Sequence, residues 1–173
     1  VSLKITVSFL VILCSTFSNI SLFYVGIIGH ITNQQFGLTN SGGSDQFDNG
    51  NDVHMWQIYD GNDDQKWFFY NNTIRLNTDR EMCLNLENGR TSNGTYIELW
   101  ECDGSTAQAW FYDGLNKMIR LVKNPDKCIN LENGTIQRGT EIQLWDCNES
   151  NTNMQWVINA VDPYDNPMLG TIR

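Results

Sequence analysis

The sequence has few of the residues on which most catalytic and metal sites depend. It contains only two histidines, His30 and His54, and we find no Ser-His-Asp or Cys-His set. The closely spaced CxxC or HxxxH pairs of zinc sites are absent. The one catalytic arrangement left open is a facing pair of carboxylates, as glycosidases use. We therefore predict a non-catalytic protein that needs no cofactor and no metal.

Basic residues are also few, with 11 Lys and Arg against 20 Asp and Glu among 173 residues. A net charge of −9 repels phosphate backbones, so nucleic acid is a poor partner. Strong helix formers are scarce, whereas Gly, Asn, Thr and Trp are plentiful, which is typical of short strands joined by tight turns. The length suits one domain and not two large ones.

The acidic clusters "DNGND" and "DGNDD" invite comparison with a calcium-binding loop. When Gly50 is aligned with the fixed glycine of an EF-hand, Phe47 falls at a ligand position and Trp56 falls where a Glu is needed. The clusters are therefore interpreted as solvated loops.

Charge is missing from the N-terminal region, where no charged residue lies between Lys4 and Asp45 if His30 is neutral. One basic residue followed by an apolar run is typical of a secretory signal peptide. The alternative is an uncleaved membrane anchor, because residues 5–29 are long enough to cross a bilayer. Interrupting Ser, Thr and Asn residues favour the signal peptide. We expect a leader over residues 1–29, a secreted domain over residues 30–161 and a tail over residues 162–173, with membrane contact only if the leader is an anchor.

A repeat is the main feature that the sequence does contain. The segment from Cys83 to Cys102 and the segment from Cys128 to Cys147 share twelve of twenty residues, and they lie 45 residues apart. Each pair of cysteines is separated by 19 positions. Because no zinc-type cluster competes for them, we predict the disulfides Cys83–Cys102 and Cys128–Cys147.

Tryptophan and glycine positions extend the repeat upstream to a third copy. A tryptophan ends the central motif of each copy, a glycine precedes it at a fixed offset, and a second tryptophan follows: Trp56, Trp100, Trp145; Gly50, Gly94, Gly139; Trp67, Trp110, Trp156. The first copy has two extra residues in its turn and lacks both cysteines. Gly37 lies nearest the position of the first cysteine, and Ile58 takes the place of the second.

Each copy contains short segments such as "KMIRLV", "KCINLE" and "TEIQLW", in which apolar and polar residues alternate. One such unit cannot bury its apolar face alone, so the copies must pack together. A propeller also repeats every 40 to 45 residues, but it needs four or more blades. Three units around a shared axis fit better.

These motifs resemble the ricin B-chain type of lectin domain. The resemblance covers residues 30–160 and rests on Cys-x-Asx, a "QLW"-like strand, a second Cys and Gln-x-Trp in register. Gln65-Lys-Trp67 and Gln108-Ala-Trp110 fit the last motif, whereas the third copy has Met154-Gln-Trp156. The resemblance implies an all-β fold, the β-trefoil, with three repeats of about 45 residues. It also implies carbohydrate or glycoprotein glycans as partners.

The resemblance assigns one sugar pocket to each repeat, with an aromatic ring that stacks on the sugar and polar groups that bind its hydroxyls. No repeat keeps every family residue, and we rank the third repeat first because it keeps the most. Trp67, Trp110 and Trp156 are expected in the core instead. The candidates are Asn130, Gln143, Trp145 and Asn153, with Met154, in the third repeat; Asn85, Glu98, Trp100 and Gln108, with Ala107, in the second; and His54, Trp56, Asp64 and Gln65, with Thr39, in the first.

The most important departure from the family is Asn for Asp at positions 85 and 130. An amide has one accepting oxygen and an NH2 donor, so it suits a different arrangement of hydroxyls from a carboxylate. The galactose preference common in the family is thus in doubt, and both asparagines also suit a turn-capping role. Two alternative functions stay open: a protein-binding trefoil, such as an inhibitor or toxin subunit, and the binding module of a larger glycoside-active enzyme.

Overall fold

The computed structural model describes residues 24–43 and 46–161, in which twelve strands and five short 3-10 turns form a β-trefoil. The strands of the first repeat are β1 (Tyr24–His30), β2 (Asn33–Asn40), β3 (Asn51–Gln57) and β4 (Trp67–Tyr70). Those of the second are β5 (Thr73–Leu76), β6 (Met82–Leu86), β7 (Thr95–Glu101) and β8 (Trp110–Asp113). Those of the third are β9 (Met118–Leu121), β10 (Asn124–Leu131), β11 (Thr140–Asp146) and β12 (Trp156–Ala160). The 3-10 turns are η1 (Asp63–Gln65), η2 (Glu87–Gly89), η3 (Thr106–Gln108), η4 (Glu132–Gly134) and η5 (Thr152–Met154).

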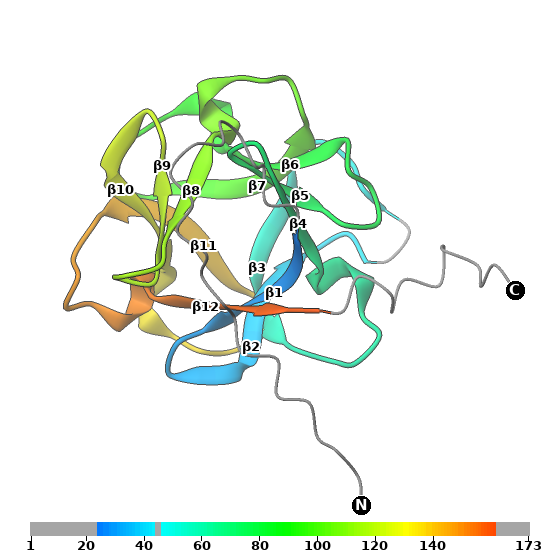
Figure 1. Cartoon of the computed structure of the whole chain (residues 1–173), viewed down its shortest axis with the longest axis horizontal. Coiled ribbons are helices and arrows are strands. Elements are labelled where there is room, and N and C mark those ends of the chain that lie inside the picture. Colours follow the sequence, from blue (N-terminus) through cyan, green and yellow to red (C-terminus); the bar gives the residue numbers. More distant parts are fainter. Residues whose placement is uncertain (1–23, 44–45, 162–173) are drawn as a thin grey trace, which may run out of the picture.

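Three antiparallel hairpins, β2–β3, β6–β7 and β10–β11, are arranged around a common axis (Figure 1). Their second strands β3, β7 and β11 also pair with one another, which joins the three repeats. The other six strands pair as β1–β4, β1–β12, β4–β5 and β8–β9 and form the barrel that the hairpins cap. Within the described ranges, no helix has the length and apolar character needed to cross a membrane.

The tryptophan that ends each repeat is a core residue, as the sequence predicts. All three are no more than 1% exposed, and each indole Nε1 donates a hydrogen bond of 2.9–3.1 Å to a backbone carbonyl of its own repeat's hairpin. A buried indole needs such a partner, because an unpaired N–H in the core costs free energy. The three equivalent pairs are Trp67 with Leu38, Trp110 with Leu84 and Trp156 with Ile129.

Both predicted disulfides are present. Cys83 is bonded to Cys102 and Cys128 to Cys147, with Cα–Cα distances of 5.2 and 5.1 Å. Each closes a loop with a sequence separation of 19. In the chain-entropy account, a loop of that length stabilises the fold by about 3 kcal/mol.

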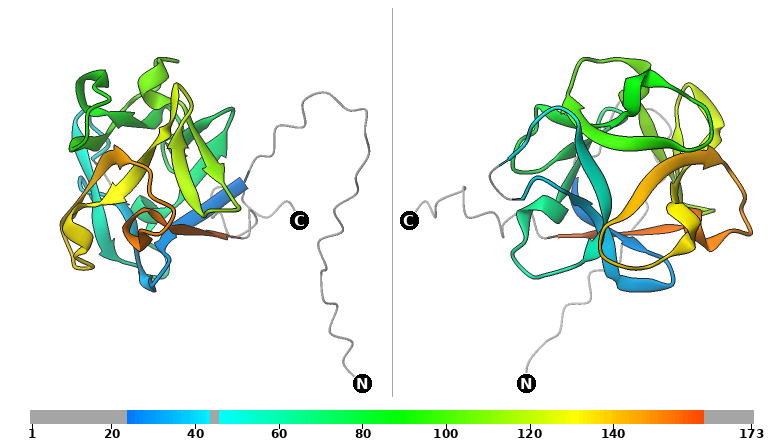
Figure 2. Two further views of the ribbon diagram at one scale, coloured as in Figure 1. Left: turned by 90° about the vertical axis from the view of Figure 1, so that its left-hand side faces the viewer. Right: turned by 180° about the vertical axis from the view of Figure 1, so that it is seen from behind.

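The domain begins earlier than the sequence predicts. Residues 24–29, which the leader hypothesis includes, belong to β1, and this strand pairs with β12 from Gly26↔Ala160 to His30↔Trp156. The two strands lie side by side in Figures 1 and 2. Ile28 in β1 is fully buried, because it faces the core. The boundary therefore lies before Tyr24, and the rest of the leader and the tail from residue 162 fall outside the described residues.

The first repeat replaces the disulfide with a close packing contact. Strand register aligns Gly37 with Trp56, in the same way that Cys83 aligns with Trp100 and Cys128 with Trp145. A Cβ placed on Gly37 would lie 2.5 Å from the carbonyl oxygen of Ile28 and 3.1 Å from Cδ1 of Ile58. Ile58 thus packs over Gly37 where the other repeats have their second cysteine, and the alignment of both positions is confirmed.

Candidate functional site

The strand register brings together the residues predicted for each sugar pocket. Asn85 pairs with Glu98 and Asn130 with Gln143, and the less certain alignment of Thr39 is confirmed by its pairing with His54. In every repeat the central tryptophan follows two positions later on the same strand, so its side chain leaves from the same face as the polar residue.

The central tryptophans of the second and third repeats, Trp100 and Trp145, also border the turn of a neighbouring repeat. A Cβ placed on Gly50 would lie 4.0 Å from Trp100, and one placed on Gly94 would lie 3.9 Å from Trp145. These glycines have φ values of +88° and +83°, which a residue without a side chain adopts at little cost. The turns therefore let a neighbouring backbone approach the indole, and each site is built by two repeats.

The second repeat has a hollow of about 590 Å³ beside Trp100. It is lined by three predicted residues, Asn85, Glu98 and Trp100, together with Ala107 and the loop residues Glu87, Asn88, Gly89, Asp103, Ser105 and Thr106. The indole is 38% exposed, whereas Glu98 is only 9% exposed. The site thus has an accessible aromatic surface above a nearly buried carboxylate.

Glu98 is held by one direct hydrogen bond. Nδ2 of Asn85 donates to Oε1 of Glu98 at 2.8 Å and also to the carbonyl oxygen of Leu86 at 3.0 Å. Burial raises the pKa of Glu98 above its usual value, the bond from Asn85 lowers it, and the nearby carboxylates of Glu87 and Asp52 raise it further. Among the described residues, none of the groups that shift the pKa of Glu98 is a cation.

In the third repeat, Nε2 of Gln143 donates to Oδ1 of Asn130 at 3.1 Å, and both side chains are buried. Trp145 is 41% exposed. Asn153 lies against the η4 turn, since a Cβ on Gly134 would be only 2.6 Å from its Nδ2. All four predicted residues therefore lie in or beside one site, with Asn153 filling space that is open above Ala107 in the second repeat.

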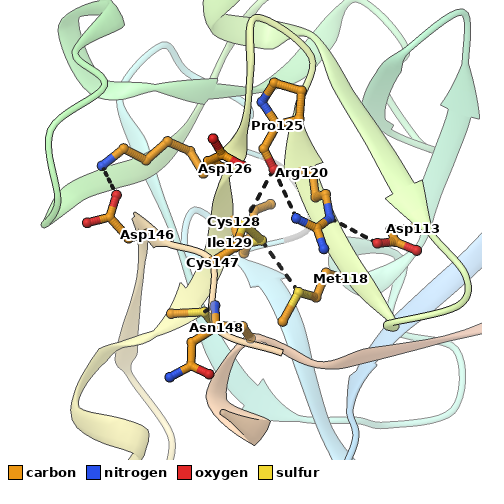
Figure 3. Close-up of a disulfide and its surroundings, with 12 residues drawn as sticks. Asp113, Met118, Arg120, Pro125, Asp126, Cys128, Ile129, Asp146, Cys147 and Asn148 are labelled. Carbon is orange, nitrogen blue, oxygen red and sulfur yellow. Dashed lines mark hydrogen bonds and ion pairs between the residues drawn. A yellow bond between two sulfur atoms is a disulfide. The ribbon is translucent and has the colours of Figure 1, made fainter. Parts of the chain in front are cut away.

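The hollow next to Trp145, of about 680 Å³, extends away from these four residues toward the Cys128–Cys147 disulfide. Its lining includes Arg120, Asp126, Glu149 and Met154. Figure 3 shows Arg120 between the carbonyl of Pro125 and the carboxylate of Asp113, to which its Nε donates at 3.0 Å. Arg120 is thus held in a structural network beside the hollow.

In the first repeat, a residue of the third repeat covers the central tryptophan. The guanidinium carbon of Arg138 lies 5.6 Å from the centre of the Trp56 ring, and Nη2 donates to Oε1 of Gln57 at 2.6 Å and to the hydroxyl of Tyr59. The His54 ring stacks beside Trp56 with centroids 5.2 Å apart, and Asp64 is buried. The indole of the predicted first pocket is therefore only partly exposed, with Arg138 beside its ring.

Two predicted sugar contacts, Gln65 and Gln108, lie inside the protein instead. Both are fully buried. Gln65 binds the carbonyl of Gln57 and the N–H of Tyr59, and Gln108 binds the carbonyl of Glu101 and the N–H of Asp103. The glutamine of Gln-x-Trp thus stabilises the loop after the central strand rather than facing a ligand.

Met154 takes the place of this glutamine in the third repeat. It is 1% exposed, and its sulfur accepts a 3.3 Å contact from the N–H of Asn148. A thioether cannot donate, so only the accepting half of the glutamine's role is kept.

Sequence reasoning missed Arg138 and Asp52. Arg138 precedes the turn glycine of its copy, where the other copies have Asn49 and Asn93. Each of those asparagines accepts a backbone N–H of the next repeat, from Glu101 at 2.7 Å and from Asp146 at 2.9 Å. The exchange of Asn for Arg was therefore visible in the aligned copies. Asp52 lies opposite Glu98 because of the register between strands β3 and β7. This register between two repeats cannot be read from the sequence copies.

Comparison with known proteins agrees with this architecture. The sequence model of the ricin-type beta-trefoil lectin domain matches residues 26–156. The chain belongs to this family. The ricin-type domain thus includes most of β1, and its fold is that of a carbohydrate-binding module. No curated protein sequence matches the chain.

Several solved structures share the ricin-type fold. A mosquitocidal holotoxin is 22% identical, with a TM-score of 0.67 over 80% of this chain and 17% of that one. The agglutinin from Abrus precatorius is 18% identical, with a TM-score of 0.64 over 79% of this chain and 46% of that one. The C-half of the earthworm R-type lectin, solved in complex with GalNAc, is 17% identical, with a TM-score of 0.66 over 80% and 99%. The chain therefore spans less than half the length of the first two.

Proposed function

We propose that this chain is a secreted, non-catalytic lectin domain that binds carbohydrate at its second and third repeats. The observation that carries the proposal is an exposed indole beside a buried polar pair, Asn85–Glu98 or Asn130–Gln143, at the same register in both repeats. An indole covers the apolar C–H face of a pyranose, and the polar pair binds its hydroxyls.

The two proposed pockets differ from each other in the groups they offer a sugar. The third has two amides, Asn130 and Gln143, which accept and donate hydrogen bonds. The second has a carboxylate at Glu98 and an alanine at position 107. The earthworm lectin half was solved with GalNAc and a homologue from Momordica charantia with α-methyl-D-galactoside, which supports carbohydrate as the ligand class. Because neither pocket here has the family's Asp, we expect a preference other than simple galactose binding.

The test is glycan binding by array and calorimetry with three single variants, Trp100→Ala, Trp145→Ala and Trp56→Ala. We expect the first two changes each to cost about 1–3 kcal/mol of binding free energy at their own site, the range for aromatic stacking on a planar ligand. For a millimolar ligand that loss removes detectable binding. Trp56→Ala is the matched control, since Arg138 covers that ring, and circular dichroism checks that each variant folds.

Two other functions are possible outcomes of the same measurement. If no glycan signal depends on Trp100 or Trp145, the pocket proposal is wrong and the protein-binding trefoil is favoured. If sugar polymers are cleaved by the purified domain, the non-catalytic assignment fails. A longer chain that carries a catalytic domain beyond residue 173 would instead make this the binding module of an enzyme.

Secretion is tested separately. Two disulfides are typical of an exported protein, and β1 must be retained for the barrel to close. We therefore expect the N-terminus of the exported protein to lie before Tyr24. Recovery of the uncleaved chain in washed membranes would support an anchor instead.

A further inference from the structure

The floor of the second hollow presents hydrogen-bond acceptors. Both hydrogens of Asn85 Nδ2 are already used, one on Glu98 and one on the carbonyl of Leu86. A carboxylate only accepts hydrogen bonds, so the NH2 end of the Asn85 amide must face Glu98. The amide oxygen of Asn85 therefore points away from Glu98. Oδ1 of Asn85 and Oε2 of Glu98 have no partner among the described residues. A ligand that fills this floor must therefore donate.

The charge of the second hollow also favours a donating, positively charged ligand. Glu87, Glu98 and Asp103 line it, no Lys or Arg does so within the described part of the chain, and Asp52 lies opposite Glu98 in the strand register. Glu87 pairs with Arg90, whose Nη2 lies 3.6 Å from its carboxylate, and the two side chains are 40% and 60% exposed. Solvent screens that pair, so Glu98 keeps an uncompensated charge.

The equivalent site in the third repeat offers a different set of hydrogen-bonding groups. There the Gln143–Asn130 bond leaves amide hydrogens as well as amide oxygens for a ligand. Asn153 also lies over Gly134, whereas in the second repeat a Cβ on Gly89 would stand 3.9 Å from Ala107. The second site therefore has more open space beside its 3-10 turn, and a more negative floor, than the third site.

We propose that the second hollow binds a sugar with a free ammonium group, that is, a hexosamine whose nitrogen is not acetylated. This inference rests on the proposed lectin function. The pyranose ring lies on Trp100, and the ammonium group donates to Glu98 and Asn85. An ammonium has three donors and no acceptor, its bonds to a carboxylate are charge-assisted, and the nearby indole adds cation–π attraction. An N-acetyl group carries no charge, and it would place a carbonyl oxygen, which is an acceptor, next to the acceptor oxygens of Glu98 and Asn85.

The experiment is calorimetry on the whole domain with glucosamine and galactosamine, their N-acetyl forms and the parent hexoses. Nα-acetyl-lysine amide serves as an ammonium group without a sugar ring. We expect about a tenfold preference for the free amines, equal to about 1.4 kcal/mol, the lower range of a hydrogen bond to a charged group. Glu98→Gln should remove this preference. Glu81→Gln is the matched control, because it makes the same charge change at an exposed position of the same repeat.

The outcomes separate this inference from the lectin function. If sugars bind through Trp100 or Trp145 but the amines show no Glu98-dependent preference, the ammonium proposal is wrong and the lectin function stands. If the lysine derivative binds as well as the hexosamines, the hollow recognises ammonium without a sugar ring, and the proposal is overturned. If no sugar binds, both fail. A preference lost in Glu98→Gln and kept in Glu81→Gln confirms it.

Discussion

The first repeat and the two that follow it form the same fold with different contacts. The second and third each have a disulfide and an exposed central tryptophan. The first has Ile58 packed over Gly37 in place of the disulfide, and Arg138 covers Trp56. All three keep the buried terminal tryptophan and its hydrogen bond. The trefoil thus depends on the core of each repeat, whereas the covalent link and the binding face can be lost from one repeat alone.

The largest effect is expected at the shared core. Replacing Trp67, Trp110 or Trp156 by Ala should lower the free energy of unfolding by about 3–5 kcal/mol in each case, because a large buried side chain and its hydrogen bond are removed. Chemical denaturation of the three variants measures this directly. A much smaller decrease for Trp67→Ala would show that the first repeat is not equivalent to the others even in its core.

Removing one disulfide should cost somewhat less. Cys83→Ala/Cys102→Ala and Cys128→Ala/Cys147→Ala should each lower stability by about 3 kcal/mol through the freed loop. The reverse experiment in the first repeat, Gly37→Cys/Ile58→Cys, should destabilise the fold, since a Cβ at position 37 meets the carbonyl of Ile28 at 2.5 Å. A stabilised, cross-linked product would contradict this account of why the first repeat has no disulfide.

A smaller effect concerns His30, which pairs with Trp156 where Leu76 pairs with Trp67 and Leu121 with Trp110. His30 is 1% exposed, and its burial lowers its pKa, an effect partly offset by the nearby backbone of Thr152. Between this lowered pKa and the unfolded value of about 6.5, only the unfolded chain binds the proton. Stability should therefore fall as pH drops through that window, by at most about 1.4 kcal/mol per pH unit.

His30→Leu copies the residue of the other two repeats and should flatten this slope. Denaturant unfolding between pH 7 and pH 5 compares it with the parent chain. His54→Gln is the comparison, because the pKa of His54 is also lowered by burial, Asp52 partly offsets that effect, and its ring is less completely buried than that of His30. An unchanged slope in His30→Leu would assign the acid sensitivity elsewhere.

The smallest effect is expected from Arg138→Asn, which restores the residue found before the turn glycine in the other two copies. Uncovering the Trp56 ring should raise its accessibility to acrylamide. Stability should change by about 1 kcal/mol or less, since the guanidinium of Arg138 makes its hydrogen bonds at the protein surface. Fluorescence quenching of Arg138→Asn, minus that of Arg138→Asn/Trp56→Phe, isolates the Trp56 signal. Equal quenching with and without Arg138 would show that His54 alone shields the ring.

Most of the fold could be predicted from the sequence, because the same sequence motif occurs in three copies. Comparison of the copies gave the disulfide pairs, the core tryptophans and the positions of Gly37 and Ile58. The start of the domain could not be located in this way. The apolar residues of β1 continue an apolar leader, and burial in a barrel gives the same composition as a secretory segment.

The candidate site was predictable in its outline but not in its accessibility. The family resemblance assigned Asn85 and Glu98 to one pocket and Asn130 and Gln143 to another, and both pairs are cross-strand neighbours within a hairpin. Whether a side chain faces solvent or the loop behind it depends on packing between repeats. Gln65 and Gln108 therefore lie inside, and Arg138 covers a tryptophan that lies far from it in the sequence.

The pairing of β1 with β12 has a consequence for how this protein is made. The first strand of the barrel emerges from the ribosome long before its partner, and it stays without that partner until the last strand has been synthesised. Contacts between such distant segments slow folding, because the chain between them must be ordered first. A ribosome-bound chain that has not yet reached Trp156 therefore exposes the apolar residues of β1. We therefore expect this protein to depend on chaperones most during the interval before β12 closes the barrel.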